Sequence, residues 1–187
     1  MGQIVNLERW AAKNATVFGE KYRAEWDIPF VIWNRKWAIY DLIGNREGSR
    51  CLVEQLAELA SKCDHYNHRY LIYKSKLEVY QGKFEQAHQT IESLLAELES
   101  FSDLETAEVF SQLSDTYLHL SRFDQAIEYR EKAAALFLKH NDRLSHGQAR
   151  MQIGLARWKK GDYHGALAEL MEAEDIFQEF GAKPLIA

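Results

Sequence analysis

The 187-residue sequence contains only two prolines and two cysteines. Because proline interrupts helices, so few of them leave most of the chain free to be helical. Cys51 and Cys63 do not form a metal-type pair, and the first twenty residues lack an apolar core, so we expect reduced thiols in a cytoplasmic protein. No apolar run approaches the roughly 18 residues that span a bilayer, and we expect no contact with a membrane.

The sequence also has no excess of basic residues, since it contains 23 Lys and Arg and 28 Asp and Glu, and its net charge is −5. Binding to phosphate backbones needs a basic patch, so we expect no direct contact with nucleic acid. Glycine-rich phosphate loops and a Ser/His/Asp or Cys/His grouping are absent as well. The sequence therefore predicts no cofactor, no metal and no catalytic residues.

What the sequence does contain is helical periodicity, clearest between Phe110 and Ala133. Phe110, Leu113 and Tyr117 recur at the spacing of one helix face, and a short break at residues 120–122 follows. Beyond the break, Phe123, Ala126, Ile127, Arg130 and Ala133 resume the same spacing, with Arg130 where an apolar residue is usual. This stretch predicts a helical hairpin.

The hairpin pattern repeats along the chain. Ala87, Ala126 and Ala166 are separated by 39 and 40 residues. The same offsets relate three further sets, which are Ser75, Ser114 and Gly154; Phe84, Phe123 and Tyr163; and Gly82, Ser121 and Gly161. The small residues Ser75, Ser114 and Gly154 are expected where the first helix must let its partner helix approach, and Gly82, Ser121 and Gly161 are expected in the turns between helices. A fixed period of this length indicates an array of stacked hairpins.

These motifs resemble the tetratricopeptide repeat, a helix–turn–helix with small residues where its two helices cross. The common repeat has about 34 residues, whereas the longer period here is similar to that of kinesin light chains and of the sensor domains of maltose-type transcriptional activators. The resemblance implies an all-α superhelix, with about four hairpins and an extra N-terminal helix in one domain. It also implies regulated binding of proteins or peptides.

The period assigns approximate boundaries to each unit. We expect an N-terminal helix within 1–26, a degenerate repeat at 27–63 with helices near 29–43 and 50–63, repeats at 64–101, 102–141 and 142–181, and the start of a further helix at 182–187. The second helix of the 64–101 repeat is expected at 84–98. Ser102 and Glu105 have the spacing of a capping box, and residues 121–124 repeat it in weaker form.

The concave wall of such an array is formed by the first helix of each unit, and it is the predicted binding surface. On these helices, residues such as Glu108, Ser111, Gln148 and Met151 turn away from the partner helix. The residues selected as partner-binding mix aromatic, charged and amide side chains: Arg69, Tyr73, Lys76, Tyr80, Gln112, Asp115, His119, Gln152, Trp158 and Lys159. Apolar neighbours such as Ile72, Val79, Leu118 and Leu155 are instead expected in the core. Lys76, Asp115 and Leu155 occupy equivalent places, and an acid in the middle argues against a clamp for C-terminal carboxylates.

We therefore interpret the chain as a protein- or peptide-binding scaffold or sensor module of a larger cytoplasmic signalling or transcriptional regulator. Two other interpretations stay open. One is an enzyme, or an accessory subunit of one, with a site near His65 and His68. The other is a structural module that dimerises. Because the last hairpin keeps an apolar set that includes Leu167 and Met171, we also expect homo-oligomers through an exposed C-terminal end.

Overall fold

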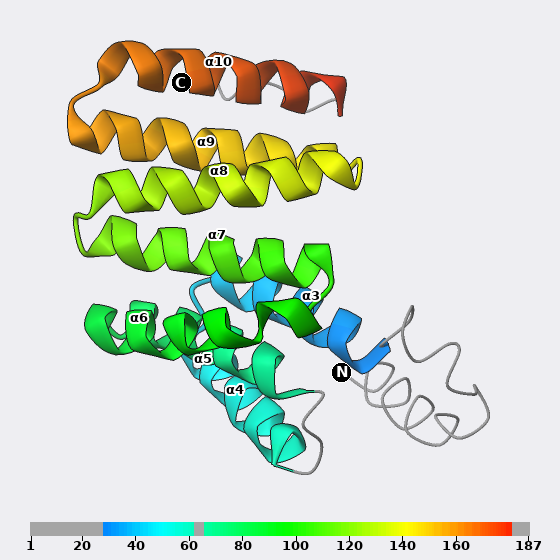
Figure 1. Cartoon of the computed structure of the whole chain (residues 1–187). Helices are drawn as coiled ribbons and strands as arrows, with labels where there is room; N and C mark the ends of the chain where they lie inside the picture. Colours follow the sequence, from blue (N-terminus) through cyan, green and yellow to red (C-terminus); the bar gives the residue numbers. More distant parts are fainter. Residues whose placement is uncertain (1–27, 62–65, 181–187) are drawn as a thin grey trace. The chain divides into compact units, whose positions relative to one another are not determined.

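The computed structural model describes residues 28–61 and 66–180 (Figure 1). The chain divides into two compact units, Met1–Gln55 and Leu56–Ala187, which we describe separately. The helix expected within 1–26 and the further helix expected at 182–187 lie outside the described residues. Within them every regular element is a helix, and none of these helices is long and apolar enough to cross a membrane.

The first unit contains α3 (Ile28–Leu42) and most of α4 (Arg46–Ala60). Helix α4 begins at Arg46 rather than near residue 50, because Asn45 caps it. The Asn45 Oδ1 atom accepts a hydrogen bond of 2.9 Å from the Gly48 amide. A Cβ atom at Gly48 would lie 2.9 Å from the Tyr40 ring, so glycine permits the two helices to meet there.

The second unit consists of antiparallel helical hairpins. Its elements are α5 (Asn67–Tyr80), α6 (Phe84–Glu92), the 3₁₀ helix η2 (Ser93–Ser100), α7 (Asp103–His119), α8 (Phe123–Lys139), α9 (Arg143–Lys160) and α10 (Tyr163–Glu179). Figure 1 shows α7, α8, α9 and α10 side by side in chain order. The predicted all-α fold with stacked hairpins is therefore confirmed.

The small residues of the repeat lie where the two helices of each hairpin cross. Ser75 donates a hydrogen bond of 2.9 Å to the Ala87 carbonyl, and Ser114 donates one of 2.7 Å to the Ala126 carbonyl. In the third hairpin a Cβ atom at Gly154 would lie 2.9 Å from Leu170 Cγ. A larger residue at any of these places would push the helices apart.

Buried apolar residues join successive hairpins. Ile91 and Leu94 of the second helix pack with Val109 and Leu113 of α7. Ile127 of α8 packs in turn with two residues of α9, Ile153 and Ala156, and with Leu118. In both contacts a second helix is covered by the first helix of the next unit, as expected for a solenoid in which units contact only their neighbours.

The two predicted capping boxes have different outcomes. Ser102 caps α7, since its hydroxyl accepts a hydrogen bond of 3.3 Å from the Glu105 amide and the Ser102 amide donates one of 2.9 Å to the Glu105 carboxylate. The weaker box at 121–124 was wrong. Ser121 adopts φ +58°, and Arg122 occupies the N-cap without a side-chain bond. Ser121 instead takes the left-handed turn that Gly82 and Gly161 take elsewhere.

The second helix of the first complete repeat is less regular than predicted. The sequence predicted one helix at 84–98, but α6 ends at Glu92 and continues as the 3₁₀ helix η2. The change begins where the Ser93 hydroxyl donates a hydrogen bond of 2.8 Å to the Thr90 carbonyl. Serine side chains compete with the backbone for such carbonyls, which favours the tighter winding.

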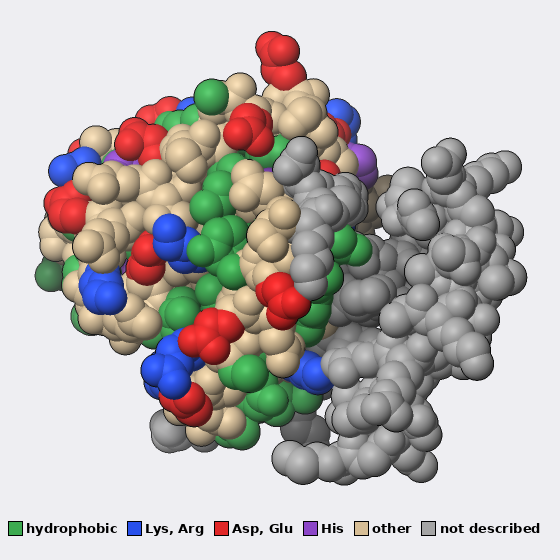
Figure 2. Space-filling view, turned by 90° about the horizontal axis from the view of Figure 1, so that it is seen from below, with side chains coloured by type: hydrophobic (Ala, Val, Ile, Leu, Met, Phe, Trp, Pro, Cys, Tyr) green, Lys and Arg blue, Asp and Glu red, His purple; other side chains and the backbone are tan. Residues whose placement is uncertain are grey.

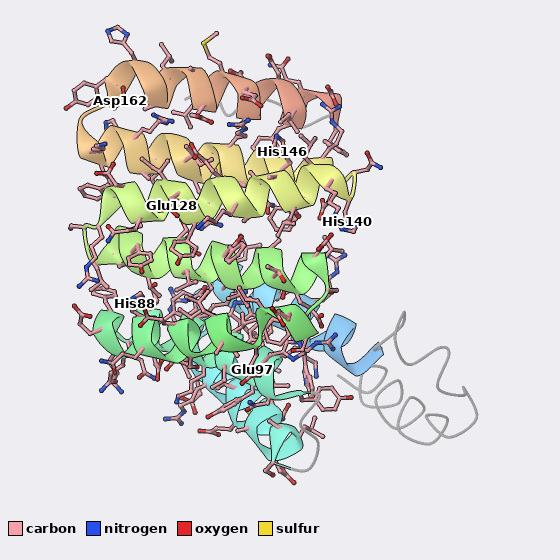
Figure 3. All side chains as sticks on the ribbon, viewed as in Figure 1. His88, Glu97, Glu128, His140, His146 and Asp162 are labelled. Carbon is pink, nitrogen blue, oxygen red and sulfur yellow. The ribbon has the colours of Figure 1, made fainter. Side chains whose placement is uncertain are left out.

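Ion pairs link the open ends of the last two hairpins. Asp103, at the start of α7, lies 2.7 Å from Lys139 Nζ and 2.8 Å from His140 Nε2 at the end of α8 (Figure 3, where His140 is labelled). Arg143 and Glu179 are 3.0 Å apart at the corresponding ends of α9 and α10. These exposed pairs contribute little to stability and mainly fix which ends meet.

Candidate functional site

A cavity of about 340 Å³ lies within the second unit, between first helices of successive hairpins and α8. We call it the groove. Its lining combines charged, amide, hydroxyl and apolar side chains: Lys76 from α5; Glu108, Ser111, Gln112 and Asp115 from α7; Arg130 and Phe137 from α8; and Ser145, Gln148, Ala149, Met151 and Gln152 from α9. A volume of this size lies at the lower end of ordinary ligand sites.

Arg130 is the one lining cation that reaches the groove from a second helix. It is only 7% exposed, and the other hairpins have Ile91 and Leu170 at its place. Its Nε atom donates a hydrogen bond of 3.3 Å to the Ser114 hydroxyl, and its Nη2 atom pairs with the Asp115 carboxylate. The pairing neutralises Asp115, so the sequence argument against binding a carboxylate, which considered Asp115 alone, loses its basis.

The other two charged groups of the groove are Lys76 and Glu108. The Lys76 ammonium lies 4.7 Å from the centre of the Tyr73 ring, a cation–π contact. Glu108 is half-buried, and burial raises the pKa of its carboxyl group, although Lys76 and Arg69 oppose the shift. The groove thus holds both signs of charge, as expected of a surface that recognises polar groups by position.

A buried hydroxyl in the groove lacks a hydrogen-bond partner within the described residues. It belongs to Ser111, which lines the cavity on α7. The neighbouring Gln112 is satisfied on one side, because its Nε2 atom donates a hydrogen bond of 3.1 Å to the Ser75 hydroxyl. An unpaired buried hydroxyl costs free energy, and a bound polar group would recover it.

Four of the predicted partner-binding residues line the groove together. They are Lys76, Gln112, Asp115 and Gln152. Tyr73 is buried beneath Lys76, and Arg69 lies beside it on α5 with its guanidinium 3.6 Å from the Glu105 carboxylate. Neither of these two residues lines the cavity.

The remaining predicted residues lie away from this cavity. The His119 ring stacks on Phe84 with 4.8 Å between ring centres, and Tyr80 is half-buried at the end of α5. Trp158 is 56% exposed and Lys159 is also exposed, both near the end of α9. Four of the ten residues predicted as partner-binding therefore line this cavity, and their role in binding stays a prediction.

Sequence reasoning missed the contribution of α8. Arg130 and Phe137 line the groove from a second helix, whereas the predicted surface used first helices alone. The sequence did indicate that Arg130 is unusual, since a cation stands where the repeat usually has an apolar residue. Nothing in the sequence indicated that Phe137 lines the groove, because an aromatic residue at a helical position ordinarily belongs to the core.

The alternative site near His65 and His68 is described only in part. The His68 Nε2 atom lies 3.1 Å from Glu105 Oε1, and its ring lies 4.9 Å from the Phe101 ring. His65 lies outside the described residues. Among those that are described, no group of three or more His, Cys, Asp or Glu side chains could hold a metal ion.

Comparison with protein families supports the repeat assignment. A family model described as tetratricopeptide repeat matches residues 105–179, which include all of α8, α9 and α10 and most of α7. Residues 105–179 are therefore similar to the tetratricopeptide repeat. Tetratricopeptide repeats generally mediate protein–protein interactions, and the family is typically a non-catalytic scaffold.

Solved structures resemble the chain in fold. BtubC (BKLC) from P. vanneervenii matches 79% of this chain at 17% identity with a TM-score of 0.55, and the chain spans 57% of that protein. MamA matches 84% of this chain at 14% identity with a TM-score of 0.36, and 96% of MamA is covered. No curated protein matches the sequence. At such low identity the likeness to BtubC shows the fold alone.

Proposed function

We propose that the groove binds an extended segment of a partner protein, so that the chain acts as an interaction scaffold rather than an enzyme. The observation that carries this proposal is the cavity itself. It brings two cations, two carboxylates and the unpartnered Ser111 hydroxyl together on one concave surface. Tetratricopeptide arrays use their concave surfaces for binding.

The lining suits a peptide. Gln148 and Gln152 lie one turn apart on α9, and an amide side chain can both donate to and accept from a peptide backbone. Met151 and Phe137 supply apolar area for a side chain between these polar contacts. The groove would thus fix the register of the segment by hydrogen bonds and gain affinity from burial.

We further propose that the chain is the sensor or adaptor module of a larger cytoplasmic regulator involved in signalling or transcription. This proposal is supported by the 39- and 40-residue period, which resembles that of kinesin light chains and of activator sensor domains. In such a regulator, a segment would bind in the groove, and the neighbouring parts of the protein would respond to this binding.

Selection from a displayed peptide library, followed by calorimetry of the enriched peptides, tests the groove. Ser111→Ala removes the unpartnered hydroxyl and should weaken binding about fivefold to tenfold, since a hydrogen bond is worth about 1 kcal/mol. The matched control is Ser93→Ala, because Ser93 is exposed on η2 outside the groove. Both variants should remain folded, which thermal unfolding checks.

The same peptides should also lose affinity on Gln152→Ala, which truncates a half-buried lining residue. Enriched peptides that bind Ser111→Ala and Gln152→Ala as tightly as the parent would place the binding surface elsewhere. A library that yields no enriched peptide under conditions where the protein is folded would also count against the proposal.

A further inference from the structure

The last hairpin exposes an apolar face that its predecessor keeps covered. On α8, the residues Ile127, Glu131 and Ala134 contact α9: Ile127 packs on Ile153 and Ala156, Glu131 lies 3.6 Å from Arg157, and the Ala134 carbonyl lies 3.0 Å from His146 Nδ1 (His146 is labelled in Figure 3). Forty residues later, the same places on α10 are Leu167, Met171 and Glu174. All three are exposed.

The contrast in exposure is large. Ile127 is 9% exposed, whereas its equivalent Leu167 is 59% exposed and Met171 is 58% exposed. Trp158 takes the place of Leu118, a neighbour of Ile127, and it is exposed as well. Figure 1 shows why: α9 lies between α8 and α10, and no described helix follows α10 in the row. Contiguous apolar faces of this kind mark interaction sites.

We propose that the outer face of α10, formed by Leu167, Met171 and Glu174 with Trp158 beside it, binds an amphipathic helix of a partner protein in the way that α8 binds α9. This surface is distinct from the groove, and the inference does not depend on the proposed function. The interface between α8 and α9 has a counterpart between α6 and α7, and the proposed contact continues the series by one step.

The contact between α8 and α9 also specifies which residues the partner helix should carry. An aliphatic residue and a small residue three positions later should match Ile153 and Ala156, so that the helix can approach Leu167 closely. At the place of Arg157 the partner should carry an apolar residue, because the residue opposite is Met171 and not Glu131. An arginine buried against methionine would lose its partner.

The difference between Glu131 on α8 and Met171 on α10 allows a test of how the partner helix is aligned on α10. The probe is an 18-residue peptide with the sequence of α9, residues 143–160, acetylated and amidated to favour the helix. A second peptide carries Arg157→Leu. Amide shifts of the isotopically labelled full chain report binding. The leucine peptide should shift the amides around Leu167 and Met171 and should bind at least about fivefold more tightly than the arginine peptide.

A compensating change in the protein sharpens the test. Met171→Glu restores the acid that α8 presents to Arg157, so this variant should reverse the preference and bind the arginine peptide more tightly than the leucine peptide. Met171 is exposed, so the variant should fold as the parent does, which circular dichroism checks. Ser111→Ala in the groove should leave both affinities unchanged.

Several results would overturn the inference. The inference would be wrong if neither peptide shifted the α10 amides at millimolar concentration. It would also be wrong if the two peptides bound equally tightly both to the parent and to Met171→Glu. Shifts of the same amides with protein concentration, in the absence of peptide, would show that a second copy of the chain covers this face. Shifts confined to the groove would assign the peptides to the other surface.

Discussion

Arg130 of α8 pairs with Asp115 of α7 at a place where the repeat ordinarily has an aliphatic residue. Arg130 is 7% exposed, and its guanidinium also donates a hydrogen bond to the Ser114 hydroxyl, so it is held at the helix crossing. The other hairpins have Ile91 and Leu170 there and need no such pair. Because an ion pair with a buried guanidinium gains little net stability over apolar packing, we propose that this pair serves the groove rather than the stability of the hairpin.

Replacing Arg130 by leucine should separate stability from binding. Arg130→Leu restores the aliphatic residue of the other hairpins and leaves Asp115 partly open to solvent, so the free energy of unfolding should stay within about 1 kcal/mol of the parent. Peptides selected on the groove should bind more weakly. Urea unfolding followed by circular dichroism and calorimetry of the peptides measure the two effects.

The matched comparison is Arg130→Ala, which also removes the buried aliphatic stem of the side chain. This variant should unfold about 2 kcal/mol more easily than Arg130→Leu because of the lost packing. Equal stability of the two variants would mean that the stem is not packed as the structure has it. Loss of several kcal/mol in Arg130→Leu would show that the ion pair itself holds the hairpin together.

The Ser75 hydroxyl forms hydrogen bonds with two groups, so its removal should lower the free energy of unfolding. Ser75 is fully buried, donates to the Ala87 carbonyl and accepts from Gln112 Nε2. Ser75→Ala leaves the buried Gln112 amide without this partner, so the free energy of unfolding should fall by about 1–3 kcal/mol. Ser93→Ala, on the exposed side of η2, should change it by less than about 0.5 kcal/mol. Thermal unfolding of both variants distinguishes a buried serine from a surface one.

The sequence predicted the hairpins well because their determinants recur at a fixed period. Ala87, Ala126 and Ala166 identify the crossings without knowledge of the fold, since only small residues fit there. The groove was predicted in part. Lys76 and Asp115 follow from helix geometry, but the pairing of Asp115 with Arg130 depends on side-chain reach between two helices, which periodicity does not contain. That the chain forms a single domain stays a prediction.

Overpacking tests the assigned register of the hairpins. Ala126 has no exposed surface and its carbonyl accepts the Ser114 hydrogen bond, so Ala126→Leu should lower the free energy of unfolding by about 1–3 kcal/mol. Ala135 is on the same helix and exposed, so Ala135→Leu should be nearly neutral. Equal melting temperatures of the two variants would show that the crossing of α7 and α8 is not at Ala126.

Two glutamates three residues apart on α7 should affect the pH dependence of stability in opposite directions. Hydrogen bonds from His68 and from the Ser102 amide and hydroxyl lower the pKa of Glu105 well below its ordinary value of 4.5. Burial raises the pKa of Glu108 above that value. A lowered carboxyl pKa means that the unfolded chain binds the proton more tightly, and a raised pKa means that the folded chain does.

The sign follows for each residue. Glu105 stabilises the fold above pH 4.5, and this contribution is lost as the pH falls through the lowered pKa of the folded state. Glu108 destabilises the fold increasingly as the pH rises above 4.5 through its raised pKa. Glu105→Gln should therefore lower the free energy of unfolding at pH 7, by about 1–2 kcal/mol, and flatten its decline in acid. Glu108→Gln should raise it at pH 7 and leave it nearly unchanged near pH 4.

Urea titrations of the parent and both variants between pH 3 and pH 8 measure these effects, at constant ionic strength so that screening does not vary. The difference between Glu108→Gln and the parent should grow with pH, while the difference between Glu105→Gln and the parent should shrink toward acid. Parallel curves for Glu108→Gln and the parent would mean that the Glu108 carboxylate is solvated in the groove. Its burial beside Ser111 would then have to be abandoned as a feature of the binding surface.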